Sequence, residues 1–101
     1  MSDLGSSQTS PKAVGVRLQL TREALGLAKG AFAASAGIAG NTYSQYENGK
    51  RVPELEFALR LCDRYELTLD WVYRGDPSGL KYNLAEKIIQ ARQARNSQKR
   101  K

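Results

Sequence analysis

The stretch GLAKGAFAASAGIAGNTYSQYENGKRVP, residues 26–53, decides the fold of this chain. Alanines and one phenylalanine at helical spacing predict a short helix over residues 29–36. Gly37 follows it, and because glycine adopts a positive φ at low cost, the chain can turn sharply there. A second short helix is expected over residues 40–48, closed by an Asn-Gly pair.

The second of these helices has an uncharged polar face. At about 100° per residue, its amide and hydroxyl side chains fall within one arc, while two tyrosines point the other way. The polar arc consists of Asn41, Ser44, Gln45 and Asn48, and the opposite side carries Tyr43 and Tyr46. Two short helices joined by a turn, the second with such a face, describe a helix-turn-helix.

The rest of the chain also predicts helices. Capping residues, prolines and apolar spacing place them over about 11–25, from Pro53 onward, from Thr68 to Gly75, and around 84–91. No alternating strand pattern, internal repeat or heptad run competes with this interpretation. We therefore expect an all-α fold.

Composition excludes most other classes of function. A chain of 101 residues has room for one small domain and too little for a large catalytic cleft. The single cysteine, Cys62, excludes an intrachain disulfide, and the absence of histidine removes the commonest metal ligand and general base. No long apolar run or signal peptide is present. We expect a cytoplasmic protein that is not an enzyme and that needs no metal, cofactor or membrane.

The net charge of +6 is unevenly distributed along the chain. Residues 1–80 contain nine Lys/Arg and nine Asp/Glu, whereas residues 81–101 contain seven Lys/Arg and one Glu. Residues 28–53 carry three basic side chains against Glu47 alone, while residues 54–76 carry six acids and three arginines. One face of the domain should therefore be mildly positive.

The quoted stretch resembles the Cro/repressor class of helix-turn-helix regulators, the XRE-like family. The resemblance covers about residues 14–76. It rests on Ala33 and Gly37, the small residues of the turn, and on Tyr43 and Tyr46, which follow them at apolar positions. It also rests on two short motifs. These are ENG at 47–49 and LDWVYRGD at 69–76, which is similar to the LDWLLxG close of many members.

The resemblance implies a five-helix lambda-repressor-like DNA-binding domain with an additional C-terminal amphipathic helix. The expected organisation is a disordered N-terminal arm (1–10), the helix-turn-helix domain (11–76), a C-terminal helix and candidate dimerisation element (77–95), and a basic disordered tail (96–101). In this family the second short helix enters the major groove, where amides and hydroxyls match base edges.

The resemblance also assigns roles to individual residues. Base reading falls to Gly40, Asn41, Thr42, Ser44 and Gln45, and phosphate contacts fall to Lys29, Tyr46, Asn48, Lys50 and Arg51. The turn and core of the motif comprise Ala33, Gly37 and Tyr43, and a structural ion pair joins Arg22 to Glu47.

These assignments predict a bacterial or phage-encoded, nucleoid-associated regulator of transcription. The expected partner is double-stranded DNA, bound by a homodimer at a pseudo-palindromic operator, with repression by occlusion of a promoter. An alternative is an antitoxin-like interaction module whose C-terminal segment, residues 80–101, binds an unidentified protein partner. The apolar stripe of Leu84, Ile88 and Ala91 must cover something, either its own domain or a symmetry mate.

Some positions depart from the family pattern. Ala28 and Ala39 stand where the family places Ser or Thr caps, a loss of about 0.5–2 kcal/mol each. The recognition helix is therefore expected to start late, with Asn41 as a possible cap. Thr21 falls where leucine is common, and Leu20 beside it is expected to be exposed.

Overall fold

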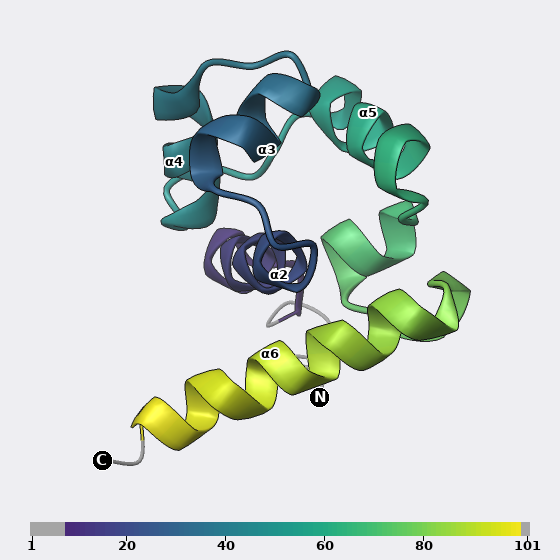
Figure 1. Cartoon of the computed structure of the whole chain (residues 1–101). Coiled ribbons are helices and arrows are strands. Elements are labelled where there is room, and N and C mark those ends of the chain that lie inside the picture. The colour runs from purple at the N-terminus through teal and green to yellow at the C-terminus, as the bar shows by residue number, and fades with distance from the viewer. Residues whose placement is uncertain (1–7, 100–101) are drawn as a thin grey trace, which may run out of the picture.

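The computed structural model describes residues 8–99, which form helices packed around one core (Figure 1). In chain order the elements are α2 (Pro11–Ala24), α3 (Lys29–Ser35), α4 (Gly40–Glu47), α5 (Leu55–Tyr65), the π-helical turn η1 (Asp70–Arg74), the 3-10 turn η2 (Pro77–Gly79) and α6 (Tyr82–Lys99). Helix α2 lies at the centre, with α3 and α4 on one side and α6 on the other. The predicted all-α fold is confirmed, because no strand occurs within residues 8–99.

Two helical starts are fixed by the caps that the sequence indicates. Ser10 Oγ accepts a hydrogen bond from Ala13 N at 3.1 Å, and Pro11 occupies the first turn of α2. Thr68 Oγ1 accepts one from Trp71 N at 3.0 Å, just before η1. These bonds satisfy backbone donors that a helix start otherwise leaves free.

Aromatic rings fill much of the core between α3, α4 and α5. Phe32 and Tyr43 meet edge to face with ring centroids 5.5 Å apart. Phe57 of α5 lies 5.1 Å from the Tyr46 ring, measured between centroids. Ala33 is 1% exposed where the two short helices pack, so a larger side chain there would separate them.

The departure at Thr21 has a structural reason. Trp71 Nε1 donates a hydrogen bond to Thr21 Oγ1 at 2.9 Å, and Thr21 Oγ1 donates to the Arg17 carbonyl at 2.7 Å. Both side chains are buried. A hydroxyl at this position therefore satisfies the indole N–H, which a leucine could not do.

The expected exposure of Leu20 is wrong. Leu20 is 1% exposed, because α6 packs along the face of α2 that carries it. Helix α2 is thus buried on two sides, against α4 and against α6.

The apolar stripe of α6 folds back onto its own domain. Ile88 is 3% exposed, and Leu84 and Ala91 are partly buried against the core. The helix also continues to Lys99, past the boundary expected at residue 95. Ala, Gln, Arg and Lys favour helix, and basic side chains suit a helix C-terminus. Residues 100–101 lie outside the described part.

The N-terminal arm is shorter than expected. Residues 8–10 are ordered against the domain, because the Gln8 carbonyl accepts a hydrogen bond from Arg17 and Ser10 caps α2. The arm expected over residues 1–10 thus includes three residues with defined positions, and residues 1–7 lie outside the described ones.

Candidate nucleic-acid interface

The turn between α3 and α4 is closed by backbone hydrogen bonds around a glycine. Gly37 has φ = 72°, a left-handed conformation that strains other residues. Its N–H donates to the Ala34 carbonyl at 3.0 Å, and the Ile38 N–H donates to the Ala33 carbonyl at 3.1 Å. This bond pattern ends α3 at once and lets α4 start three residues later.

Helix α4 starts at Gly40 without a side-chain cap. Ala39 occupies the cap position with extended φ and ψ of −70° and 150°. The expected late start with Asn41 as the cap is therefore wrong. As a result, the Asn41 side chain is not occupied in capping the start of the helix.

The polar face of α4 is open to solvent. Gly40 and Asn41 are exposed, and Thr42, Ser44 and Gln45 are half-buried. Within residues 8–99, none of these four polar side chains forms a hydrogen bond with the protein. Their donors and acceptors are available to a ligand.

The opposite face of α4 is fully packed. Tyr43 is 0% exposed and Tyr46 is 2% exposed. The phosphate contact that the resemblance assigns to Tyr46 does not fit, because its ring lies inside the core against Phe57. Tyr46 instead belongs to the packed core that supports α4 and its polar face.

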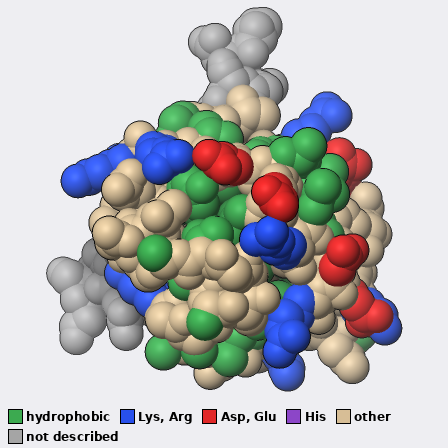
Figure 2. All heavy atoms as spheres, turned by 90° about the horizontal axis from the view of Figure 1, so that it is seen from above, with side chains coloured by type: hydrophobic (Ala, Val, Ile, Leu, Met, Phe, Trp, Pro, Cys, Tyr) green, Lys and Arg blue, Asp and Glu red, His purple; other side chains and the backbone are tan. Residues whose placement is uncertain are grey.

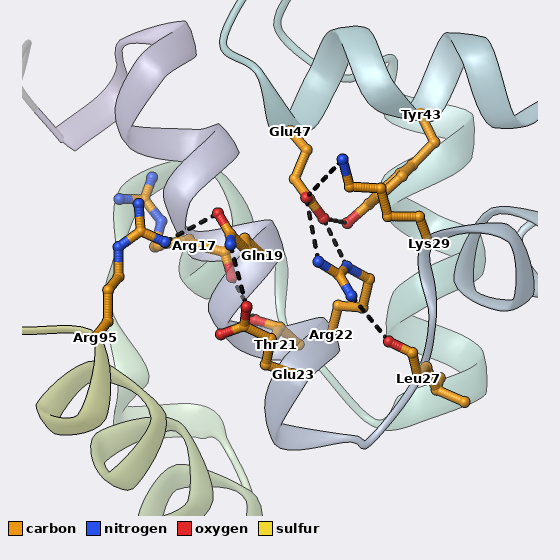
Figure 3. A network of polar contacts seen from close by, with 10 residues as sticks. All are labelled: Arg17, Gln19, Thr21, Arg22, Glu23, Leu27, Lys29, Tyr43, Glu47 and Arg95. Atoms are coloured by element: carbon orange, nitrogen blue, oxygen red, sulfur yellow. Dashed lines mark hydrogen bonds and ion pairs between the residues drawn. The ribbon is translucent and has the colours of Figure 1, made fainter. Parts of the chain in front are cut away.

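A polar network fastens α4 to α2 and α3 (Figure 3). Arg22 Nε lies 2.8 Å from Glu47 Oε2, and Arg22 Nη2 lies 3.3 Å from Glu47 Oε1. The Tyr43 hydroxyl donates to Glu47 Oε2 at 2.6 Å, and Lys29 Nζ lies 3.8 Å from Glu47 Oε1. Arg22 Nη1 also donates to the Leu27 carbonyl at 3.0 Å. The Glu47 carboxylate, 4% exposed, is thus shared by three elements.

The network changes the ionisation of its members. The hydrogen bond to Glu47 is the main reason that the pKa of Arg22 is raised. Burial, together with the nearby Glu47 carboxylate, raises the pKa of Tyr43 far above its ordinary value. The network is therefore held in a single state of charge, with Arg22 positive and Tyr43 neutral.

Basic side chains flank both ends of the helix pair. Lys29 begins α3, and its side chain is half exposed beside Glu47. Beyond α4, Asn48 and Lys50 are exposed, and the Lys50 N–H donates to the Gln45 carbonyl at 2.9 Å. The Arg51 guanidinium lies 5.5 Å from the centre of the Tyr46 ring and 3.6 Å from the Glu54 carboxylate.

Gly15 sets the distance between α2 and α4, and sequence reasoning missed it. A Cβ atom at this position would lie 2.5 Å from the Glu47 carbonyl oxygen and 2.6 Å from that of Tyr46. The only available signal was a glycine inside a helical pattern, which can mark a close approach of backbones.

The surface charge is divided as the sequence predicts. Figure 2 views the molecule from the side of α3, α4 and α5, and its acidic side chains lie mainly in the half that belongs to α5. The half above α3 and α4 shows mainly neutral side chains with basic ones at its edge. An anionic ligand would meet less repulsion on this second half.

No helix within residues 8–99 combines the length and the apolar character needed to cross a membrane. In the same part of the chain, no group of three or more His, Cys, Asp or Glu side chains could hold a metal ion.

A family model described as a helix-turn-helix domain matches residues 13–71, which include α3, α4, α5 and all of α2 except its first two residues. The comparisons with curated proteins and with solved structures gave no significant match.

Proposed function

The chain belongs to the helix-turn-helix domain family of DNA-binding regulators, and on this premise we propose that it controls transcription by reading double-stranded DNA with α4. The observation that supports this best is the free polar face of α4, which stands on a rigid packed base. Pre-organised donors and acceptors lose little entropy on binding.

Base reading is proposed for five residues of α4. The major groove, about 12 Å wide, admits a helix. Amide side chains can engage adenine in a bidentate manner, a hydroxyl can bond to several bases, and a threonine methyl can contact thymine. We assign the amide contacts to Asn41 and Gln45, the hydroxyl contact to Ser44 and the methyl contact to Thr42. Gly40, which has no side chain, lets the backbone of α4 approach the DNA closely.

Phosphate contacts are proposed for the residues that flank α3 and α4. Lys29, Lys50 and Arg51 supply positive charge, and Asn48 supplies an amide. Such contacts position the helix and add affinity without sequence information. Lys29 keeps half of its side chain exposed beside Glu47, so its ammonium can reach outward.

We further propose a cytoplasmic repressor that acts as a homodimer. A pseudo-palindromic operator would present two half-sites about 34 Å apart. Repression is favoured over activation because α3 contains no acidic residue to present to polymerase. Three exposed apolar side chains suit a dimer contact: Val52, just before α5, and Leu55 and Leu59 within it.

The alternative of an antitoxin-like interaction module has less support. The stripe on α6 that such a module would offer to its partner is covered by the chain's own core, with Ile88 3% exposed. A protein partner that co-purifies with the chain would revive this alternative.

The primary test is selection of bound DNA from a random pool at a stated salt concentration. We expect enrichment of one pseudo-palindromic sequence. Recovery of a random pool at the lowest salt, with no enrichment over several rounds, would contradict sequence-specific binding.

Two substitutions then separate base reading from phosphate contact. Gln45→Ala should lose about 1–3 kcal/mol for the selected site and leave nonspecific binding nearly unchanged. Lys50→Ala should weaken all sequences alike and make the salt slope shallower by about one unit. Identical specificity profiles for wild type and Gln45→Ala would remove Gln45 from the base-reading set.

The dimer contact is tested by sedimentation. Leu55→Asp places a charge on the proposed contact, whereas Tyr82→Asp changes an apolar side chain that is 75% exposed at the start of α6. We expect Leu55→Asp to be monomeric and Tyr82→Asp to behave as wild type. A Leu55→Asp variant that still dimerises would place the contact elsewhere.

A further inference from the structure

A pocket of about 330 Å³ between α2 and α6 is lined by three arginines. Arg17 comes from α2, and Arg92 and Arg95 come from α6. Gln8 and Asn96 add amides, and the remaining lining is apolar, so no acidic side chain among the described residues lines this pocket. Neither the fold nor the proposed DNA contact accounts for this cluster of like charge.

Within residues 8–99, the buried charge of Arg17 has no carboxylate partner. Arg17 is 5% exposed, and its Nε and Nη2 atoms donate to the Val72 carbonyl at 3.3 and 3.2 Å. Its other hydrogen bonds go to the Gln8 side chain and carbonyl. All these acceptors are neutral. A buried charge is ordinarily paired with an opposite charge, because desolvation otherwise opposes it.

The two arginines of α6 increase the positive charge of the pocket. Burial, and then the charge of Arg92, lower the pKa of Arg17. Within residues 8–99, Arg92 forms no ion pair. Arg95 Nη1 donates to Gln19 Oε1 at 2.9 Å. Gln19 Nε2 in turn donates to the Glu23 carboxylate at 3.1 Å, so Arg95 is linked to that carboxylate through Gln19. Figure 3 shows Arg95 extending from α6 toward α2.

The pocket lies on the side of α2 away from α4. At about 100° per residue, Arg17 and Leu20 of the lining point nearly opposite to Gly15, which contacts the α4 backbone. Figure 1 likewise shows α6 and α4 on opposite sides of α2. A duplex held by α4 would therefore leave this pocket open to a small molecule.

We propose that this pocket binds the phosphate group of a small phosphorylated molecule, with Arg17, Arg92 and Arg95 around the phosphate oxygens. Arg92 and Arg95 can offer paired N–H donors that match phosphate geometry. Four of the five N–H donors of Arg17 are already bonded to Gln8 and Val72, so Arg17 adds its remaining Nη1–H and its positive charge. The volume is at the lower end of the range for ligand pockets, which suits a compact ligand. The bound anion ties α6 to α2 across the pocket.

The test titrates pyrophosphate into the full chain, against NaCl of equal ionic strength, with binding followed by calorimetry. We expect saturable binding to wild type. Arg92→Gln should weaken it at least tenfold, whereas Lys87→Gln, the same charge change on the exposed part of α6, should leave it unchanged. Equal affinities for the two variants, or no binding beyond the NaCl control, would overturn the proposal.

Two further measurements keep the outcomes distinct. Amide shifts in NMR spectra should map to α2 and α6, and shifts confined to α3 and α4 would show that the anion binds the proposed DNA surface instead. In the absence of pyrophosphate, Arg92→Gln should bind DNA within about twofold of wild type. A large and uniform loss of DNA affinity would mean that the phosphate comes from the duplex, contrary to the proposal.

Discussion

Glu47 is the residue on which the position of α4 depends most directly. Its buried carboxylate accepts hydrogen bonds from Arg22 and Tyr43 and lies within ion-pair distance of Lys29. Removal of one member of a buried pair leaves the other charge uncompensated. Glu47→Ala should therefore lower the free energy of unfolding by about 3–5 kcal/mol, measured by urea denaturation. DNA binding should weaken for every sequence alike.

Tyr43→Phe is the matched control for this network. It removes the single hydrogen bond at 2.6 Å but keeps the ring, and the Arg22–Glu47 pair stays intact. A hydrogen bond to a charged group contributes about 1.5–3 kcal/mol, so the loss should be smaller than for Glu47→Ala. Equal losses for the two variants would mean that the ion pair itself adds nothing.

Tyr43 also makes stability depend on pH at alkaline values. Its burial, and then its contact with Glu47, raise its pKa above the ordinary tyrosine value near 10. Below pH 10 the folded and unfolded chains both keep the proton, so Tyr43 contributes no slope. Above pH 10 the unfolded chain releases it first, the folded chain binds more protons, and stability falls.

The urea midpoint should therefore fall as the pH rises above about 10, and the Tyr43→Phe variant should fall less steeply. Burial raises the pKa of Tyr73 as well, so part of the slope should remain in the variant. Superimposable profiles for the two proteins would contradict a buried, neutral Tyr43.

At the scale of elements, the crossing of α2 and α4 depends on a missing side chain. An added Cβ at Gly15 would lie 2.5 Å from a carbonyl oxygen of α4, so the two helices would have to separate. Gly15→Ala should destabilise the domain by about 1–3 kcal/mol, despite the gain in helix propensity.

Gly30→Ala is the control for Gly15→Ala, because a Cβ at Gly30 in α3 would meet nothing within 4 Å. It should stabilise by up to about 1 kcal/mol through helix propensity alone. Denaturant midpoints should thus shift in opposite directions. A Gly15→Ala variant as stable as Gly30→Ala would show that the helices separate at no cost.

The uncapped start of α4 predicts a stabilising substitution. Ala39 already has the extended backbone of a cap residue but offers no acceptor. Ala39→Ser should raise the free energy of unfolding by about 0.5–2 kcal/mol, measured by thermal melting. Ala34→Ser, at an exposed position inside α3, should instead cost up to about 0.5 kcal/mol. If both substitutions lower the melting temperature, a serine at position 39 does not cap α4, and the prediction is wrong.

At the scale of the whole molecule, the sequence predicted what local periodicity decides. The turn at Gly37 and the two faces of α4 follow from spacing within a few residues. The burial of Leu20, the close approach at Gly15 and the extent of α6 do not, because they arise only when α2 meets helices distant in sequence. The burial of the Tyr46 ring is a similar case, since it depends on Phe57 of α5.

Helix α6 either belongs to the cooperative fold or only adjoins it. Ile88 and Ile89 are neighbours in sequence, but Ile88 is 3% exposed and packs into the core, whereas Ile89 is 49% exposed. Ile88→Asp must either bury a charge or release α6, so it should cost at least about 3 kcal/mol. Ile89→Asp should change stability by no more than about 0.5 kcal/mol.

Urea denaturation followed by Trp71 fluorescence measures both variants, because Trp71 and Ile88 line the same pocket beneath α6. Loss of stability confined to Ile88→Asp would place α6 within the cooperative fold, and with it the arginine pocket that α6 completes against α2. Sedimentation supplies the contrary outcome. An Ile88→Asp variant that is monomeric, with wild-type stability, beside a dimeric wild type would show that the α6 stripe faces a second copy in solution.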